Sequence, residues 1–444
     1  MPKALLTRLA IEKTVTRALA DQPIRDLHTH LYPPSFGTPV PNRTGKIDPA
    51  GLMLWGLDEL LTYHYLVAEV YRVVPAHGPR GLPYEQFWKM PKQAQADHIW
   101  KHLFVERTPI SEACRGVLTS LQMLGLDVGK SKSLAKARKF FAQQEPSKYI
   151  DKVMELANVD SITMTNPVFD DNERNRWLAN PNVGVDPRFK AVLRIDPILR
   201  NWPVAAKKMS EWGYQVAPAQ DAKSLAGARR FLGDWIDRQK AIYLAVSLPP
   251  EFRIPAPAGD AVARSGQVAL EEIVLPVCAE RNLPFAMMIG SRIRVNPALG
   301  DAGDMLGLSD IASVVNICAA HPGNKFLITM LARENQHELC VAARKFGNLM
   351  PFGCWWFLNN PSIIEEMTRM RIELLGTSMI PQHSDARVLD QLLYKWQHTR
   401  AILAKVLTDK YTDTVAAGWN LTDEDVKKDA QRLLKGNFEE FLSR

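Results

Sequence analysis

The sequence is poor in cysteine, and the few cysteines that it has are scattered. Its 444 residues include five, none of them in Cys-x-x-Cys spacing: Cys114, Cys278, Cys318, Cys340 and Cys354. An odd number without motif spacing argues against a disulfide framework and against a thiolate metal cluster. We therefore expect free thiols and a reducing, cytoplasmic location.

Long apolar runs and concentrated charge are also missing from the sequence. No stretch reaches the roughly 18 uncharged apolar residues that a membrane-spanning helix needs. The formal net charge is +7, but lysine and arginine are dispersed rather than gathered in one stripe. This pattern argues against a membrane or nucleic acid as partner, while a basic surplus is compatible with an anionic small substrate.

Short apolar runs alternate with segments of helical periodicity, which is typical of parallel βα units. Eight such runs are predicted strands, at residues 24–30, 159–166, 191–196, 241–248, 285–290, 325–330, 349–356 and 378–383. Helices are predicted between and after them, among others at 204–212, 225–238, 270–281, 310–320, 334–346, 363–375 and 388–407. Eight alternating strands predict an α/β fold of the (β/α)8 TIM-barrel type. A doubly wound open sheet is the alternative, but no Gly-x-Gly-x-x-Gly follows an early strand.

One connection in this pattern is much longer than the others, because residues 31–158 separate the first two predicted strands. Most of this segment has helical periodicity with proline-rich breaks. We expect residues 1–30 and 159–444 to form the barrel, and residues 31–158 to form a mainly helical insertion that caps its mouth. The stretch 422–444 predicts one or two charged amphipathic helices.

The first predicted strand ends in His-x-His, at His28 and His30. Successive side chains on a strand alternate faces, so these two point the same way, about 7 Å apart along the chain. Neutral imidazoles are common ligands of zinc and related ions. The plainer alternative is that one of them is a satisfied polar group at a strand end.

Asp385 follows the last predicted strand. Closure of a barrel brings its first and last strands together, so this carboxylate becomes a neighbour of the two histidines. Two imidazoles and one carboxylate leave open positions on a divalent ion, which is the pattern of a catalytic site. Zinc is favoured, and manganese, nickel or iron suit the same ligands. Asp385 as the N-cap of the helix that follows is the alternative. His383 is a secondary candidate, as a supporting contact or an extra ligand.

His-x-His after the first strand and aspartate after the last resemble the amidohydrolase superfamily, and further segments resemble uronate isomerase (glucuronate isomerase), a divergent branch of it. Thr62-Tyr63-His64-Tyr65 is similar to the His-Tyr pair of that family, and Leu193-Arg194-Ile195-Asp196-Pro197 to its Arg-Pro-Asp segment. Met288-Ile289-Gly290 is similar to the family's His-Ile-Gly. The segment Phe352–Asn359 is similar to its Gly-x-Trp-Trp-Phe-Asn, and Ser384-Asp385-Ala386-Arg387 is similar to its Asp-Ser-Arg.

This resemblance implies a role for each matching residue. Asp385 is the expected metal ligand and base, His64 and Tyr65 are lid contacts in catalysis, and Arg387 contacts the substrate carboxylate or oxyanion. The remaining expected substrate contacts are Arg194, Trp355 and Trp356, and Arg292 as a partial replacement for missing family groups. The alternatives are structural ion pairs for Arg194 and Arg387, and an ordinary exposed loop position for Arg292. For His64 and Tyr65 the alternative is packing within the insertion, and for one of the two tryptophans it is core packing, since strand neighbours face opposite sides.

The chain also departs from the family pattern. Ala245 to Pro250 stand where the family has Ser-Asp-His-Gly, Met288 replaces a histidine, and Leu66-Val67-Ala68 replace Lys-Trp-Arg. The lost middle-strand histidine removes a ligand that a second ion needs. A mononuclear site follows, and the replaced polar groups leave the recognition of the sugar hydroxyls open.

Three functions are compatible with these residues. The first is a metal-dependent aldose–ketose isomerase acting on a small anionic sugar acid such as glucuronate or galacturonate, in a homo-oligomer. The second is a hydrolase or decarboxylase of the same superfamily, with an ion-activated water as nucleophile. The third is a catalytically silent barrel that binds an anionic carbohydrate or a partner protein.

Overall fold

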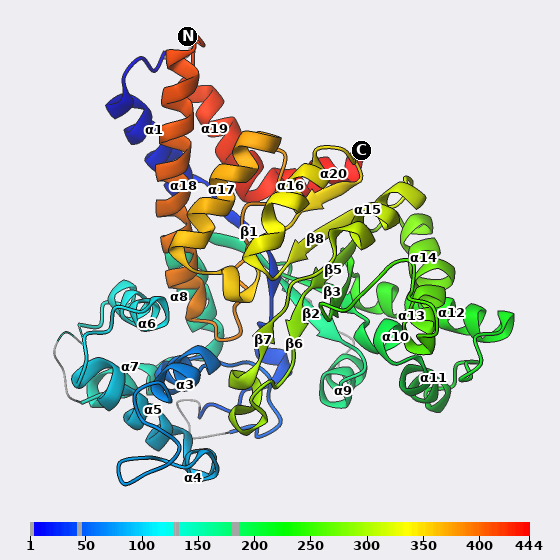
Figure 1. Cartoon of the computed structure of the whole chain (residues 1–444). Coiled ribbons are helices and arrows are strands. Elements are labelled where there is room, and N and C mark those ends of the chain that lie inside the picture. The colour runs from blue at the N-terminus through cyan, green and yellow to red at the C-terminus, as the bar shows by residue number, and fades with distance from the viewer. Residues whose placement is uncertain (1–3, 42–46, 128, 130–132, 180–185) are drawn as a thin grey trace.

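The centre of this computed structural model, which describes residues 4–41, 47–127, 129, 133–179 and 186–444, is a parallel sheet of seven strands (Figure 1). Its strand order is β1-β2-β3-β4-β5-β8-β9, and every neighbouring pair is parallel. The strands are β1 (Ile24–Thr29), β2 (Val159–Pro167), β3 (Phe189–Arg194), β4 (Leu244–Leu248), β5 (Phe285–Ile289), β8 (Phe326–Met330) and β9 (Leu349–Pro351). Seven of the eight predicted strands are therefore confirmed.

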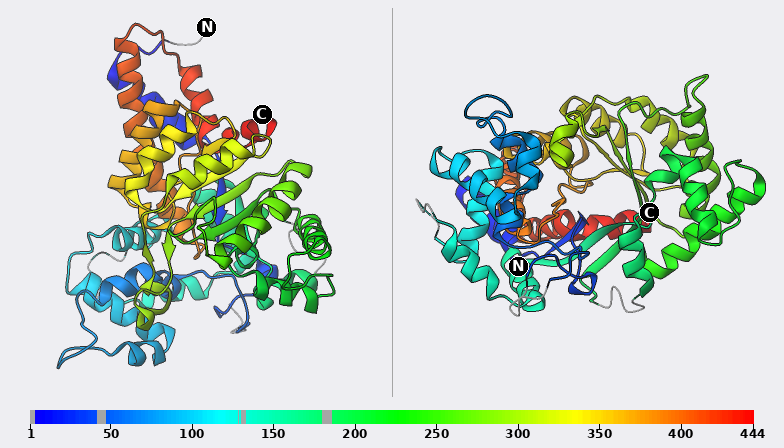
Figure 2. Two further views of the ribbon diagram at one scale, coloured as in Figure 1. Left: turned by 45° about the vertical axis from the view of Figure 1, so that its right-hand side comes forward. Right: turned by 90° about the horizontal axis from the view of Figure 1, so that it is seen from below.

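Helices surround this sheet, which curls so that strands and helices form a ring when viewed from below (Figure 2). The helices that alternate with the strands are α8 (Pro146–Ala157), α9 (Asp171–Ala179), α10 (Asp196–Arg200), α11 (Trp202–Glu211), α12 (Ala222–Gln239), α13 (Ala261–Ala269), α14 (Leu275–Glu280), α15 (Ile311–Ala320), α16 (Gln336–Ala343), α17 (Pro361–Leu375) and α18 (Gln391–Ala416). Several begin at side-chain caps. Asp221 accepts from the Ser224 amide, and Asn360 accepts from the Ile363 amide.

The two faces of the curled sheet have separate hydrophobic cores. Alternate residues such as Val192, Ala245 and Leu327 pack together on the inner face, whereas their strand neighbours join the larger core under the helices. This period of two is the pattern of a strand whose faces are both covered. The last helix, α20 (Asn437–Ser443), adds Phe438 and Phe441 to the inner core.

The eighth predicted strand, residues 378–383, is not a strand in the structure. It makes only one isolated bridge, between Ile380 and Phe352, because Pro381 has no amide hydrogen to donate. The segment nevertheless lies between β9 and β1. The Ile380 amide donates to the Pro351 carbonyl at 3.1 Å, and further along the Asp385 amide donates to the His28 carbonyl at 3.0 Å.

Between β1 and β2 the chain forms the helices α2 (Leu57–Leu61), α3 (His64–Val70), α4 (Tyr84–Lys89), α5 (Lys92–Trp100), α6 (Glu112–Met123), α7 (Ala135–Ala142) and α8. They lie largely at the end of the sheet where β1 finishes (Figure 1). A hairpin of β6 (Ser291–Arg292) and β7 (Met305–Leu306) projects to the same end. Its tip, Pro297–Gly303, packs on α3 and α4, and the Trp88 indole donates to the Ala298 carbonyl at 2.9 Å.

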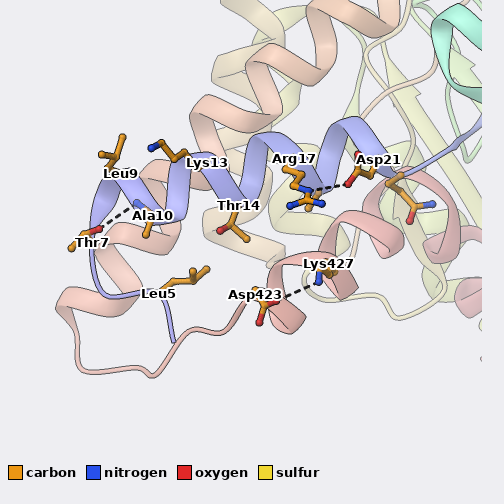
Figure 3. A pocket seen from close by; sticks show the side chains of 12 residues that line it. Leu5, Thr7, Leu9, Ala10, Lys13, Thr14, Arg17, Asp21, Asp423 and Lys427 are labelled. Carbon is orange, nitrogen blue, oxygen red and sulfur yellow. Dashed lines mark hydrogen bonds and ion pairs between the residues drawn. The ribbon is translucent and has the colours of Figure 1, made fainter. Parts of the chain in front are cut away.

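At the opposite end, α1 (Arg8–Asp21) packs on α18 and on α19 (Asp423–Gln431). A groove of about 810 Å³ lies along α1 and reaches the start of α19 (Figure 3). Its described lining residues include neither histidine nor cysteine, and two ion pairs lie along it, Arg17 with Asp21 and Asp423 with Lys427. Among the described helices, none combines the length and the apolar character that crossing a bilayer requires.

Candidate metal centre and active site

His28, His30 and Asp385 meet beyond the carboxyl end of β1. Their possible ligand atoms all lie within 4.8 Å of one another. Oδ1 of Asp385 is 3.4 Å from Nε2 of His28 and 3.3 Å from Nε2 of His30. The predicted trio therefore converges from opposite ends of the sequence.

Backbone hydrogen bonds bring these segments together. In addition to the bond from Asp385 to His28, the His30 amide donates to the Ala386 carbonyl at 2.7 Å. The alternative role of Asp385 as a helix cap is wrong, because α18 begins only at Gln391 and its N-cap residue is Asp390.

The charge states of Asp385 and His30 suit a cation. Burial alone raises the pKa of Asp385, but its close contacts with the imidazoles of His28 and His30 outweigh burial and hold the pKa well below the ordinary value. Burial lowers the pKa of His30 to about 4, so its imidazole is neutral at pH 7. A neutral imidazole and an ionised carboxylate are the forms that bind metal.

Two observations show that the trio fits a divalent ion. Both ring nitrogens of His28 are buried without a hydrogen-bond partner among the described residues, and buried polar atoms of this kind ordinarily have one. Nδ1 of His30 lies 2.9 Å from the Thr165 hydroxyl, which orients the ring and leaves Nε2 toward Asp385. In the part of the chain that the structure describes, no other group of histidine, cysteine or acidic side chains is arranged in this way.

A cavity of about 220 Å³ opens over the trio. Its lining combines cationic, acidic and aromatic side chains from many different loops: His28, His30, Tyr63, His64, Arg194, Arg200, Ser247, Met288, Ser291, Ile293, Asp301, Asp304, Trp355, Trp356, Asp385 and Arg387. Its size suits a small polar molecule rather than a polymer.

Three arginines line this cavity, and they differ in how firmly they are paired. Arg194 donates to both carboxylate oxygens of Asp196, at 2.7 and 3.1 Å, and to the Ser247 hydroxyl at 2.9 Å. Arg387 pairs with Asp301 at 3.2 Å. Arg200 approaches Asp196 only to 3.9 Å, which is beyond hydrogen-bond distance.

A search of solved structures finds close likeness over the whole chain. A uronate isomerase from Bacillus halodurans C-125 is 49% identical, with a TM-score of 0.91 over 99% of this chain and 98% of that one. The chain belongs to the uronate isomerase family. A uronate isomerase from Thermotoga maritima (TM-score 0.75, 99% of this chain and 100% of that one) and a glucuronate isomerase from Caulobacter crescentus (0.71, 100% and 95%) are each 14% identical and show the same fold. No protein-family model and no curated protein matches the sequence.

His64 and Tyr65, the pair predicted from the family's His-Tyr motif, take different positions relative to the cavity. His64, at the start of α3, lines the cavity, and burial and the charge of Arg387 lower its pKa to about 3. Tyr65 is not among the lining residues, because its hydroxyl donates to the Trp356 carbonyl at 3.4 Å. Tyr63 lines the cavity instead, and burial raises its pKa, so its hydroxyl stays protonated.

Both tryptophans of the family's aromatic motif line the cavity, and Trp355 is also buried in the inner core, which is the core packing expected for one of the two. β9 ends at Pro351, before the motif. The chain then turns through Gly353 and Trp356, which have φ values of +66° and +47°. The alternation of a strand therefore does not apply to Trp355 and Trp356.

The remaining predicted residues take unequal places. Arg292 is not among the cavity-lining residues, and its half-exposed guanidinium donates to Glu251 at 3.0 Å. This position argues against the predicted substrate contact. Ser247 and Met288, which replace the family's polar groups, are register partners on β4 and β5 and lie side by side in the lining.

His383 is fully buried, and both of its ring nitrogens lack a hydrogen-bond partner among the described residues. Its ring centroid lies 4.8 Å from those of His28 and Phe352. A Cβ on Gly353 would come within 2.0 Å of Cδ2 of His383. His383 therefore packs directly behind the metal centre and only a glycine leaves room for it.

Sequence reasoning missed Tyr63, Arg200, Asp301 and Asp304 in the cavity lining. Tyr63 stood inside a recognised motif, and Arg200 lies one helical turn after Asp196 in another, so both had a local signal. Asp301 lies at the hairpin tip and Asp304 directly follows it, and nothing in the sequence links Asp301 to its partner Arg387.

Proposed function

We propose that the protein is a metal-dependent uronate isomerase that interconverts an aldose uronate, such as D-glucuronate or D-galacturonate, with the corresponding ketose. The convergence of His28, His30 and Asp385 under an arginine-lined cavity carries this proposal. The likeness to the Bacillus halodurans uronate isomerase supports it across the whole chain.

The ligand set for the ion consists of His28, His30 and Asp385, and zinc is the favoured metal among those that suit imidazole and carboxylate. When bound, a divalent ion supplies positive charge that stabilises an oxyanion developing on the substrate. The absence of a second ligand group among the described residues supports a single ion.

Isomerisation needs a base that takes the proton from C2 and returns it to C1 through a cis-enediol. Asp385 suits this task because it is ionised, and because Oδ1 is the oxygen that faces the two imidazoles. Its Oδ2 is then left for the carbon-bound proton. After the proton has moved to C1, Asp385 is again a carboxylate, so the cycle closes without another reactant.

The hydroxyl proton must also move, from O2 to O1. Neutral His64 carries one ring N–H, so that nitrogen can give its proton to O1 and then take the proton of O2, which returns the ring to its neutral form. The pKa of about 3 keeps it in this form throughout the neutral range. Tyr63 lies beside it, with ring centroids 4.2 Å apart, and offers a second neutral hydroxyl donor to the cavity.

The substrate carboxylate requires a cationic contact, and we assign this task to the arginines of the cavity. Arg194 and Arg387 remain candidates from the sequence, but each already donates to an aspartate. Arg200 lies 3.9 Å from the nearest carboxylate oxygen of Asp196, so of the three arginines it has the most N–H groups left to donate to a substrate. Trp355 and Trp356 supply apolar walls for the sugar-acid chain.

The same proposal covers the finer architecture. Segment 378–386 occupies the eighth position of a (β/α)8 barrel between β9 and β1, with residues 1–30 and 159–444 as the barrel. Residues 31–158 are the helical insertion that caps its mouth. A homo-oligomer is expected in solution, and sedimentation velocity measures it.

The experiment incubates metal-replete protein with D-glucuronate and with D-galacturonate and follows the ketouronates by NMR. Ketouronate formation that the Asp385→Asn variant does not catalyse is the expected result. Absence of turnover with every uronate tried overturns the proposal. A panel of amides, lactones and aromatic carboxylates on the same sample then decides whether hydrolysis or decarboxylation takes its place.

A further inference from the structure

Asp385 has an unusual backbone conformation. Its φ is +50°, in the left-handed region that side chains other than glycine rarely adopt. This conformation is unfavourable for residues other than glycine, and it persists only where surrounding contacts hold it. Glycine is no substitute at this position because the site uses the carboxylate.

One set of contacts holds the amide side of the preceding residue, Ser384. The buried carboxylate of Asp26 accepts from the Ser384 amide at 3.1 Å and from the His28 amide at 3.3 Å. Its other oxygen accepts from the indole of Trp396 on α18, at 2.9 Å. Asp26 thus ties together the strand that carries the histidines, the segment that carries Asp385, and α18.

A second set of contacts holds the carbonyl side of the same residue. The ammonium group of Lys395, one residue before Trp396, donates to the Ser384 carbonyl, and Asn359 donates to it at 3.3 Å. Lys395 is only 3% exposed and forms no ion pair with a carboxylate among the described residues. Burying an ammonium group without an ion-pair partner costs free energy, so packing alone does not account for a lysine at this position.

We propose that Lys395 and Asp26 are positioning residues. Lys395 binds the carbonyl of Ser384 and Asp26 binds its amide, and together they hold Asp385 in its left-handed conformation. This conformation sets the position of the Asp385 carboxylate relative to the two imidazoles. Neither residue touches the cavity. The inference rests on the proposed function for the ion and the base, and it adds α18 to the elements that build the site.

The test compares Lys395→Met and Asp26→Asn with a control variant, Lys405→Met. Lys405 lies on the same helix, but its side chain is exposed and pairs with Glu365. For each protein, chelator competition gives the zinc dissociation constant, the cobalt form gives a visible spectrum, and steady-state kinetics with D-glucuronate separate kcat from KM.

We expect zinc affinity to fall about 10- to 100-fold in Lys395→Met and Asp26→Asn, the range found for groups that orient metal ligands. The cobalt spectrum changes with the ligand geometry, and kcat falls more than KM rises. Lys405→Met matches the parent in all three measurements. Asp26→Asn keeps the shape of the side chain, so it carries the test if Lys395→Met does not fold.

Two further outcomes separate this inference from the proposed function. A parent that isomerises uronates, together with variants that keep its zinc affinity, cobalt spectrum and kcat, overturns the positioning role alone. A parent that binds zinc but turns over no uronate, together with variants that lose zinc, leaves the positioning role standing and removes the isomerase.

Discussion

We expect Gly353→Ala to be among the most damaging single-methyl changes in the molecule. Gly353 has a φ of +66°, and the added Cβ would lie 2.0 Å from Cδ2 and 2.6 Å from Nε2 of His383. His383 is fully buried and confined between the rings of His28 and Phe352, each 4.8 Å away by ring centroids. It cannot move aside without pushing on the ring of His28.

The magnitude follows from two separate contributions. A left-handed φ on alanine costs about 1–2 kcal/mol. Overpacking a filled core adds about 1–3 kcal/mol. The sum is a loss of about 2–5 kcal/mol in the free energy of unfolding.

Gly125→Ala is the matched control. Gly125 has a φ of +78°, and a Cβ there would meet nothing within 4 Å, so this variant carries the backbone contribution alone. Urea unfolding of the two variants, with and without zinc, gives the packing contribution as their difference. We expect zinc to stabilise Gly353→Ala less than it stabilises the parent, because the displaced His383 presses on His28. Equal losses in the two variants, with zinc stabilising both as it does the parent, would refute this reasoning.

Three other predictions concern separate residues. Glu173 is buried and accepts from Tyr32 and Asn166, and burial raises its pKa from 4.5 to about 8. The contribution of Glu173 to the free energy of unfolding is therefore complete below pH 4.5 and lost as pH rises through 8. The urea midpoint of the parent should fall over this pH range, whereas that of Glu173→Gln should stay level. The same pH dependence in both proteins would contradict this prediction. Arg200→Gln should raise KM for D-glucuronate about tenfold or more, the worth of a charge-assisted hydrogen bond, while Arg292→Gln leaves it unchanged; equal KM values in both variants would remove Arg200 from the site. All five thiols are buried, and burial raises the pKa of Cys114 and Cys318 to about 12, so a disulfide reagent should label the native protein only as fast as it unfolds; rapid native labelling would argue against the burial.

The parts of the fold that the sequence predicted correctly are those with a strong local signal. β5 is a run of five buried residues, Phe285–Ile289, and its predicted bounds differ by one residue at the end. The trio of His28, His30 and Asp385 was found because an eight-strand count placed the two ends of the chain side by side. That neighbourhood is present, although hydrogen bonds of an irregular segment create it rather than a full strand.

The differences from the predictions arise where local rules give way to loop geometry. The strand prediction for 349–356 continued past Pro351, where β9 ends, so the strand alternation invoked for Trp355 and Trp356 does not apply there. The family's motif pointed to Tyr65 beside His64, whereas the structure places Tyr63, the N-cap residue of α3, in the cavity lining and the Tyr65 hydroxyl against the Trp356 carbonyl.

Lys395 and Asp26 carried no signal in the sequence at all. A lysine on a long helix ordinarily lies on a solvated face, and an aspartate before a strand histidine has no motif of its own. Their proposed role rests on hydrogen bonds to Ser384, which is 11 residues away from Lys395 in the sequence and 358 residues away from Asp26. Only three-dimensional contacts bring out such a role.

The metal content of the purified protein tests the central claim most directly. The parent and the variants His28→Ala, His30→Ala and Asp385→Asn are loaded with zinc, dialysed against metal-free buffer, and measured by atomic emission. We expect one zinc ion per chain in the parent and only the buffer background in each variant. A parent without zinc, or variants that hold as much zinc as the parent, would contradict a metal centre built from these three residues.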